Sequence, residues 1–235
     1  MSSLPLLDRP IWNALHTEQR ALARAHGDAV RFEAEATALA ACARPDAAAL
    51  ADLAALLAPG EVIGALFDEA PAIPAALPLE AVDRIAVAQM VHVDPDEVAT
   101  ERVPPPADGL TLGDADAAEM LALARLTRPG PFATRTHTMG LFLGVRAADG
   151  RLVAMAGQRM RLPGLHEVSG VCTHPDAVGR GLAAALVAEV TRRILAEPAV
   201  PFLHVRADNA RAIGLYQRLG FTIRRELAYV IVRRR

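Results

Sequence analysis

Two glycines, Gly179 and Gly181, stand directly before an unbroken apolar stretch, and this feature most limits how the chain can fold. The segment Leu182–Leu195 has apolar residues at helical spacing, and His166–Thr173 before the glycines has the composition of a strand. A strand, a glycine loop and a helix therefore follow one another. Unpaired N–H groups at the start of a helix bind anions where glycine removes the side chains, so the order predicts either a phosphate-binding loop or a tight turn.

Two common phosphate loops are excluded by the residues around these glycines. A P-loop needs Lys-Ser or Lys-Thr after its last glycine, whereas Leu182 and Ala183 follow here. The dinucleotide fingerprint G-x-G-x-x-G needs a third glycine, which is absent.

Composition narrows the class of protein further. The chain has 235 residues, 52% of them hydrophobic and 22% charged, which is typical of a globular protein with one large or two small domains. A net charge of −2 gives no reason to expect a nucleic-acid partner.

Cys42 and Cys172 belong to no metal-binding or disulfide pattern, so we expect two buried thiols and no metal. We find no secretory signal and no apolar run of membrane-spanning length, and we expect a cytoplasmic protein.

The proline-rich segment Glu101–Gly109 predicts a boundary that divides the chain into regions 1–106 and 107–235. Before the boundary, composition predicts helices at Ile11–Ala25 and Ala47–Leu57, and strands at Glu61–Phe67 and Asp83–Val93.

After the boundary, the pattern predicts a helix over 114–127 and the strand order β-β-β-α-β-α-β-β. The predicted strands and helices are Met139–Val145, Arg151–Leu162, His166–Thr173, the helix Leu182–Leu195, Phe202–Arg206, the helix Asn209–Leu219, and two closing strands at 221–225 and 227–233. The pair Asp149–Gly150 indicates a hairpin.

A second motif, "NARAIGLYQRLGF" (Asn209–Phe221), follows the first at a distance of one helix and one strand. Together with "VCTHPDAVGRGLAAAL", it resembles the GNAT superfamily of acyl-CoA N-acyltransferases. The loop pattern V-x-x-x-P-x-x-[QR]-G-x-G-x-[GA] and the pattern N-x-x-A-x-x-L-Y-x-x-x-G-F both occur in order. The resemblance covers about Leu110–Arg235. One position departs from the loop pattern: Val178 stands where the family has Gln or Arg, and Arg180 follows two residues later.

The resemblance implies an α+β fold with a mixed, splayed β-sheet flanked by helices, and acetyl-CoA as acyl donor. It implies that backbone N–H groups of the glycine loop bind the pyrophosphate and that the strand edge at Val171–Thr173 pairs with the pantetheine arm. A bulge at Ser169–Gly170 would separate this strand from Phe202–Arg206. The residues implied to bind the cofactor are Val171, Cys172, Thr173, Val178, Gly179, Arg180, Gly181, Leu182, Ala183, Ala184, Asn209, Ala212 and Tyr216.

Acyl transfer to an amine needs a base, an oxyanion site and an acid. Tyr216 occupies the family's general-acid position, and its alternative is a packing role in the apolar stripe of its helix. Glu167 is the candidate base, acting directly or through water, and its alternative is a carboxylate that only shapes the strand. His204 is the next candidate base.

We therefore expect an N-acetyltransferase that moves an acetyl group from acetyl-CoA to a primary amine by direct attack in a ternary complex. Its acceptor is a small-molecule or protein amine, with neither nucleic acid nor membrane as partner, and a homodimer is left open. The alternatives are a non-catalytic acyl-CoA-binding module and a mononucleotide site. The N-terminal α/β half is interpreted as a degenerate copy of the same fold without a second cofactor.

Overall fold

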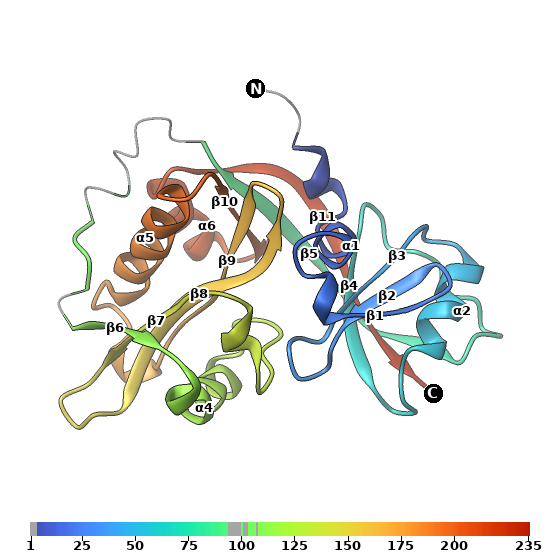
Figure 1. The fold of residues 1–235 in the computed structure, drawn as a ribbon, viewed down its shortest axis with the longest axis horizontal. Helices are drawn as coiled ribbons and strands as arrows, with labels where there is room; N and C mark the ends of the chain where they lie inside the picture. The colour runs from blue at the N-terminus through green and yellow to red at the C-terminus, as the bar shows by residue number, and fades with distance from the viewer. Residues whose placement is uncertain (1–3, 94–99, 101–102, 107) are drawn as a thin grey trace.

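The computed structural model describes residues 4–93, 100, 103–106 and 108–235. Their strands form an 11-stranded mixed sheet in the order β1-β2-β3-β4-β11-β5-β10-β9-β8-β7-β6, flanked by helices on both faces (Figure 1). The strands are β1 Ala23–His26, β2 Ala29–Phe32, β3 Leu39–Cys42, β4 Val62–Phe67, β5 Leu79–His92, β6 Gly109–Leu112, β7 Phe142–Arg146, β8 Leu152–Leu162, β9 Leu165–Thr173, β10 Val200–Arg206 and β11 Phe221–Arg234. The helices are α1 Pro10–His16, α2 Ala47–Ala55, α4 Ala117–Thr127, α5 Leu182–Leu195 and α6 Ala210–Arg218, with short 3-10 turns at η1 Pro5–Asp8, η2 Arg20–Leu22, η3 Asp114–Asp116, η4 Thr136–Met139 and η5 Pro175–Ala177.

The helices cover the two faces of the sheet because each buries an apolar stripe. On α5, Leu186, Val190 and Ile194 are fully buried against β8, β9 and β10, as the helical spacing predicts. The helix α6 joins the same hydrophobic cluster. The helices α4 and α1 pack into separate clusters on the other face of these strands. The predicted mixed, splayed sheet flanked by helices is therefore confirmed.

The two halves of the chain repeat one order of elements and exchange their last strands. In the first half, the antiparallel strands β1–β3 lead through α2 to β4, which runs parallel to β3. In the second, the antiparallel strands β6–β9 lead through α5 to β10, which runs parallel to β9. The long strand β5 then pairs with β10, whereas the long strand β11 pairs with β4, and the two pair with each other. The interpretation of the first half as a degenerate copy of the same fold stays a prediction.

Two predictions about the elements are wrong, one of a helix and one of a pair of strands. The helix predicted over Ile11–Ala25 ends at His16, because Gln19 is buried and bonds with the backbone of Arg159 and Arg161, and the chain then turns into β1. The two predicted closing strands are one strand, β11, with a register shift between Ile223 and Arg225. Arg224 is the extra residue of this bulge, and the strand continues through it.

The sequence pattern missed four short strands, β1, β2, β3 and β6. Each has four residues, and all residues of β2 and β3 are buried, so they show no alternation of apolar and polar side chains. Of the predicted boundary Glu101–Gly109, residues 101, 102 and 107 lie outside the described residues. The division at 106 stays a prediction, although the sheet is continuous between the two halves.

Candidate active site

The strands β9 and β10 separate after a short parallel pairing. Register partners are Leu165 with Val200, His166 with Pro201, and Glu167 with Phe202, and β10 then continues in register with β5 up to Arg206. From Val168 onward, β9 therefore has no register partner on the β10 side. An unpaired strand edge offers a row of N–H and C=O groups to an extended, amide-rich ligand.

A bulge lies in β9 where the two strands diverge. The register with β8 moves from Ser169 opposite Gly157 to Cys172 opposite Met155, so two residues of β9 oppose one residue of β8. Gly170 has a φ of +63°, and a Cβ there would lie 2.8 Å from the Phe142 ring. The bulge predicted at Ser169–Gly170 is therefore confirmed, and only glycine fits this position.

The glycine loop leaves the start of α5 open. Gly179 and Gly181 have φ values of +87° and +76°, and a Cβ at either would meet no described atom within 4 Å. Gly181 is the N-cap, and no side chain caps the helix. The N–H of Ala185 bonds the Gly181 carbonyl at 3.1 Å, which leaves the N–H groups of Leu182–Ala184 in the first turn, where an α-helix supplies no carbonyl. The residues present therefore fit an anion such as a pyrophosphate.

The corresponding helix of the first half begins differently. Asp46 is the N-cap of α2, and its carboxylate accepts a hydrogen bond from the N–H of Ala49 at 2.9 Å. The carboxylate satisfies the helix dipole with the chain's own negative charge. An anion at α2 would meet this charge, whereas no side chain caps the start of α5.

The second motif places Tyr216 on α6, in the hydrophobic cluster that α5 also joins. Asn209 caps α6 by accepting from the Ala212 N–H at 3.1 Å, as its position predicts. Tyr216 is buried and meets the Phe221 ring edge-to-face with centroids 6.2 Å apart. Burial raises the pKa of Tyr216 to about 12, so the phenol holds its proton at neutral pH.

The cofactor residues inferred from the resemblance divide between the two faces of the sheet. Val171, Leu182, Ala212 and Tyr216, which come from β9, α5 and α6, pack into one cluster. Cys172 packs on the other face against α4, and burial raises the pKa of its thiol to about 11. Cys172 therefore contributes backbone to the strand edge and a core side chain. The exposed Val178 leaves the loop without the polar side chain of the family pattern.

Glu167 is fully buried and lies at the last position of β9 that pairs with β10. Each of its two carboxylate oxygens accepts two hydrogen bonds. Oε1 accepts from the Arg159 guanidinium and His204 Nδ1, each at 2.9 Å. Oε2 accepts from Arg159 Nε at 2.9 Å and from the N–H of Met160 at 3.3 Å. Burial alone would raise the pKa of Glu167, but the charge of Arg159 and the hydrogen bonds from His204 and Arg159 lower it to about 2.

The structure brings together both candidate bases named from the sequence, and it adds two residues that sequence reasoning missed. Arg159 and Gln89 complete the network around Glu167 and His204. Gln89 comes from β5, in register opposite His204 of β10. A polar residue inside the apolar run "IAVAQMVHV" was a signal that the strand contains a specific hydrogen bond, because buried amides must be partnered.

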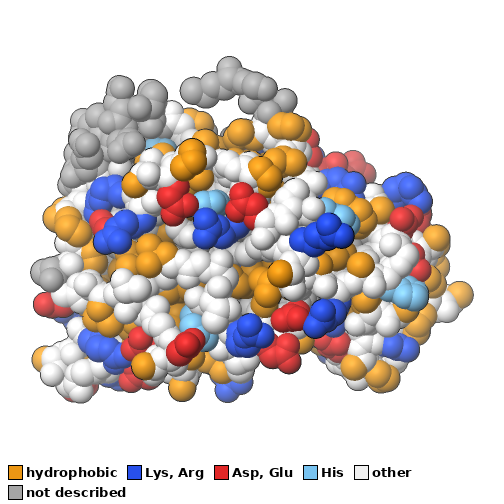
Figure 2. Space-filling model, viewed as in Figure 1, with side chains coloured by type: hydrophobic (Ala, Val, Ile, Leu, Met, Phe, Trp, Pro, Cys, Tyr) orange, Lys and Arg blue, Asp and Glu red, His pale blue; other side chains and the backbone are white. Residues whose placement is uncertain are grey.

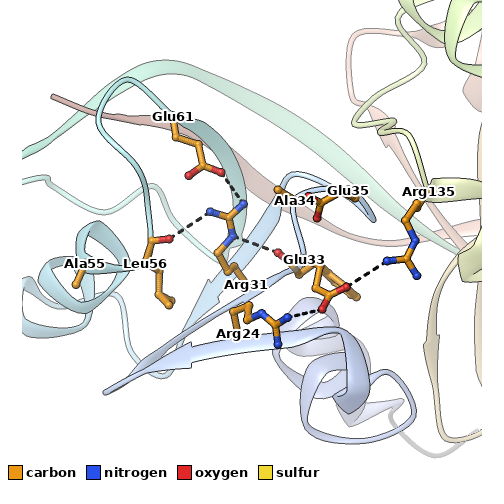
Figure 3. Close-up of a pocket in the computed structure, with 10 residues that line it drawn as sticks. Arg24, Arg31, Glu33, Ala34, Glu35, Ala55, Leu56, Glu61 and Arg135 are labelled. Atoms are coloured by element: carbon orange, nitrogen blue, oxygen red, sulfur yellow. Dashed lines mark hydrogen bonds and ion pairs between the residues drawn. The ribbon is translucent and has the colours of Figure 1, made fainter.

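A cavity of about 680 Å³ lies apart from this network and is lined by residues of the first half together with Arg135 (Figure 3). Its charged side chains pair with one another. Arg31 and Glu61 lie 2.6 Å apart, and Glu33 lies 2.6 Å from Arg24 and 3.6 Å from Arg135. Glu61 and Glu33 therefore already have guanidinium partners, whereas Glu35 lines the cavity as well. Because most of the charge in this cavity is paired within the chain, the separated strands remain the candidate active site.

Figure 2 shows basic and acidic side chains interspersed over the face drawn. In the part of the chain that the structure describes, no helix is both long and apolar enough to cross a membrane. The same residues contain no group of three or more His, Cys, Asp or Glu side chains arranged to hold a metal ion.

The structure thus has a mixed sheet in which β9 and β10 separate, followed by a helix, α5, whose N-terminus no side chain caps. This is the architecture that the two sequence motifs predict for an acyl-CoA N-acyltransferase. The FR47-like protein family model matches residues 142–230. A crystal structure described as a putative acetyltransferase from the GNAT family, from Novosphingobium aromaticivorans DSM 12444, is 41% identical with a TM-score of 0.87, and the match covers 97% of this chain and 98% of that one. This chain belongs to the GNAT family.

Two further similarities are more restricted. A GCN5-related N-acetyltransferase from Kribbella flavida is 20% identical with a TM-score of 0.58, over 95% of this chain and 91% of that one, and it supports the fold alone. Mycothiol acetyltransferase from Mycobacterium avium (strain 104) is 43% identical over 98 residues, which are 35% of this chain and 31% of the relative. The chain thus matches about a third of the length of this curated relative.

Proposed function

We propose that this protein is an N-acetyltransferase that moves the acetyl group of acetyl-CoA to a primary amine by direct attack in a ternary complex. The observation that carries the proposal is the end of the β9–β10 pairing at Glu167 and Phe202, next to the uncapped N-terminus of α5. Backbone N–H groups of Gly179–Ala184 would bind the pyrophosphate, and the free edge of β9 at Val171–Thr173 would pair with the pantetheine arm.

Tyr216 is proposed as the general acid. The amine nitrogen forms a bond to the thioester carbon, the C–S bond breaks, and the sulfur leaves with the electron pair. Tyr216 donates its proton to this sulfur and is reprotonated by solvent. The phenol is protonated at neutral pH and so has a proton to donate, while its burial makes it a weaker acid than a free phenol.

His204 is proposed to remove the proton from the amine, and Glu167 is proposed to assist His204 without contacting the amine itself. Both carboxylate oxygens already accept two hydrogen bonds, and a carboxylate with a pKa of about 2 is a weak base. The proton lost by the amine would go to His204 Nε2, and the negative charge of Glu167 would stabilise the imidazolium that forms.

A thiol-release assay tests the proposed function. Protein, acetyl-CoA and a panel of small-molecule and peptide amines are mixed, and free CoA thiol is followed, with the acceptor of mycothiol acetyltransferase in the panel because of the partial similarity. Acceptor-dependent thiol release is expected. Acetyl-CoA binding without release on any acceptor favours a non-catalytic binding module, and thermal stabilisation by ATP but not by acetyl-CoA favours a mononucleotide site.

The remaining expectations from the sequence are proposals as well. The acceptor class, a homodimeric assembly and a cytoplasmic location rest on the sequence alone. The amine panel tests the first, and light scattering of the purified protein tests the second.

A further inference from the structure

The side-chain amide of Gln89 has an orientation that its neighbours determine. Gln89 Nε2 donates to the Leu7 carbonyl at 2.8 Å, and Gln89 Oε1 accepts from the Arg224 guanidinium at 2.9 Å. Arg224 is in turn paired with Asp8. A flipped amide would place oxygen against the carbonyl and NH₂ against the guanidinium, so both contacts would become repulsive.

This orientation decides what Gln89 offers to His204. Gln89 Nε2 and His204 Nε2 lie 3.1 Å apart, and the NH₂ group has a second N–H available for that contact. His204 Nε2 must therefore accept, and it can accept only without a proton. The other ring nitrogen, Nδ1, lies 2.9 Å from Glu167 Oε1, where it must donate.

We propose that Gln89 is a positioning residue that holds His204 neutral in its Nδ1–H tautomer, with Nε2 as the basic nitrogen. The inference rests on the proposed function, because it assigns Nε2 as the atom that accepts the amine proton. In that step an N–H bond of the substrate amine breaks, and its electron pair stays on the amine nitrogen. The proton forms a bond to His204 Nε2, and Gln89 gives up its hydrogen bond to Nε2.

Charged groups lie on two sides of this contact. Glu167 of β9 faces Nδ1 and would draw a second proton onto the ring, and Arg159 of β8 partly neutralises that carboxylate. On the opposite side, the guanidinium of Arg224 on β11 contacts Gln89 and is paired with Asp8 of η1, which offsets its charge. The Gln89 N–H is thus the group in direct contact with Nε2 that opposes the double protonation favoured by Glu167.

The proposal places a residue of the first half in the proton chemistry of the second. Gln89 lies on β5, which enters the sheet between β10 and β11. The backbone carbonyl that orients it belongs to Leu7, also in the first half. The first half therefore does more than cover the sheet, because it sets which ring nitrogen of His204 carries the proton.

Nitrogen-15 NMR of histidine-labelled full-length protein tests the tautomer without any turnover. The His204 signals are assigned by their loss in His204→Gln. At neutral pH we expect a protonated Nδ1 and an unprotonated Nε2. A protonated Nε2 at this pH, alone or together with Nδ1, overturns the proposal.

Two substitutions test the role of Gln89. Gln89→Glu places an acceptor opposite Nε2, and the titration midpoint of His204 is expected to rise by about one pH unit or more. Gln89→Met removes the donor with little change of volume, so it keeps the test valid should Gln89→Glu fail to fold, and an upward midpoint shift of the same sign is expected. Gln217→Glu adds the same charge on an exposed position and should leave His204 unchanged. An unshifted His204 in a folded Gln89 variant overturns the proposal.

The pH profile of acetyl transfer separates this inference from the proposed function. In Gln89→Glu the acidic limb of kcat should move to higher pH by the same amount as the NMR midpoint, with KM for acetyl-CoA unchanged. A parent protein with the expected tautomer but no turnover on any amine would contradict the proposed function alone. If Gln89→Glu turns over but neither the acidic limb of its kcat profile nor the NMR midpoint of His204 moves, the role of Gln89 alone is contradicted.

Discussion

His204 Nδ1 lies 2.9 Å from Glu167 Oε1, and this hydrogen bond joins β10 to β9 at the point where the two strands cease to pair. The carboxylate is also held by Arg159, so a buried anion, a buried cation and an imidazole share one site at the closed end of the gap. Such a site is stable only while every member keeps its partner, because an isolated buried charge is costly.

Replacement of Glu167 by Gln should therefore destabilise the protein strongly. The variant leaves Arg159 buried without its counter-charge, and we expect a loss of about 3–5 kcal/mol in the free energy of unfolding at pH 7. Urea denaturation followed by circular dichroism measures it. Glu33→Gln, which loosens a pair with the exposed Arg24, is the control and should cost about 0–1 kcal/mol.

The same carboxylate should make the stability depend on acid. The folded pKa of Glu167, about 2, is below its ordinary value of 4.5, so its contribution is complete above about pH 4.5 and is lost as the pH falls toward 2. The difference in unfolding free energy between the parent and Glu167→Gln should narrow over this interval. A constant difference from pH 7 to pH 3 would contradict the assignment.

Tyr216→Phe should remove the acid and leave binding intact. We expect kcat to fall by about 100-fold or more while the dissociation constant for CoA, measured by calorimetry, stays unchanged. Tyr229→Phe is the matched control, since it removes the hydroxyl of another tyrosine whose pKa is raised by burial. Turnover of Tyr216→Phe equal to that of the parent would show that this ring serves packing alone.

Gly181→Asp should close the start of α5 to anions. A carboxylate at the N-cap would occupy the first-turn N–H groups as Asp46 does on α2, and we expect CoA affinity to fall by about tenfold or more. Gly60→Asp is the control, because Gly60 also has a positive φ, +79°, and open space at its Cβ. Both variants carry a similar strain of about 1 kcal/mol, so a loss of affinity in both would point to misfolding and not to the helix start.

The fragment 107–235 should not fold by itself, although it contains both recognition motifs. It lacks β5, which pairs with both β10 and β11. We expect no cooperative thermal transition for the fragment, and recovery of a folded complex when the fragment 1–106 is expressed with it. A sharp transition of 107–235 alone would show that the sheet tolerates the loss of β5.

The helices and the long strands around the glycine loop were predictable because each carries a local signal. The apolar stripe of Leu182–Leu195, the cap at Asn209 and the hairpin at Asp149–Gly150 depend on residues close in sequence. The short strands of the first half were not predictable, because each has only four residues, and β2 and β3 are buried throughout and lack the alternation that marks a strand. The network at Glu167 escaped for another reason, since Gln89 and Arg159 reach it through strand pairing and not through any motif.

The exchange of β5 and β11 has a consequence for how the protein is made. The edge of β4 is completed only by β11, so the first half emerges from the ribosome with an uncovered strand edge that must wait for the rest of the chain. Contacts between such distant segments slow folding and expose nascent chains to aggregation. Synthesis of this protein should therefore depend on chaperones more than its ordinary size suggests.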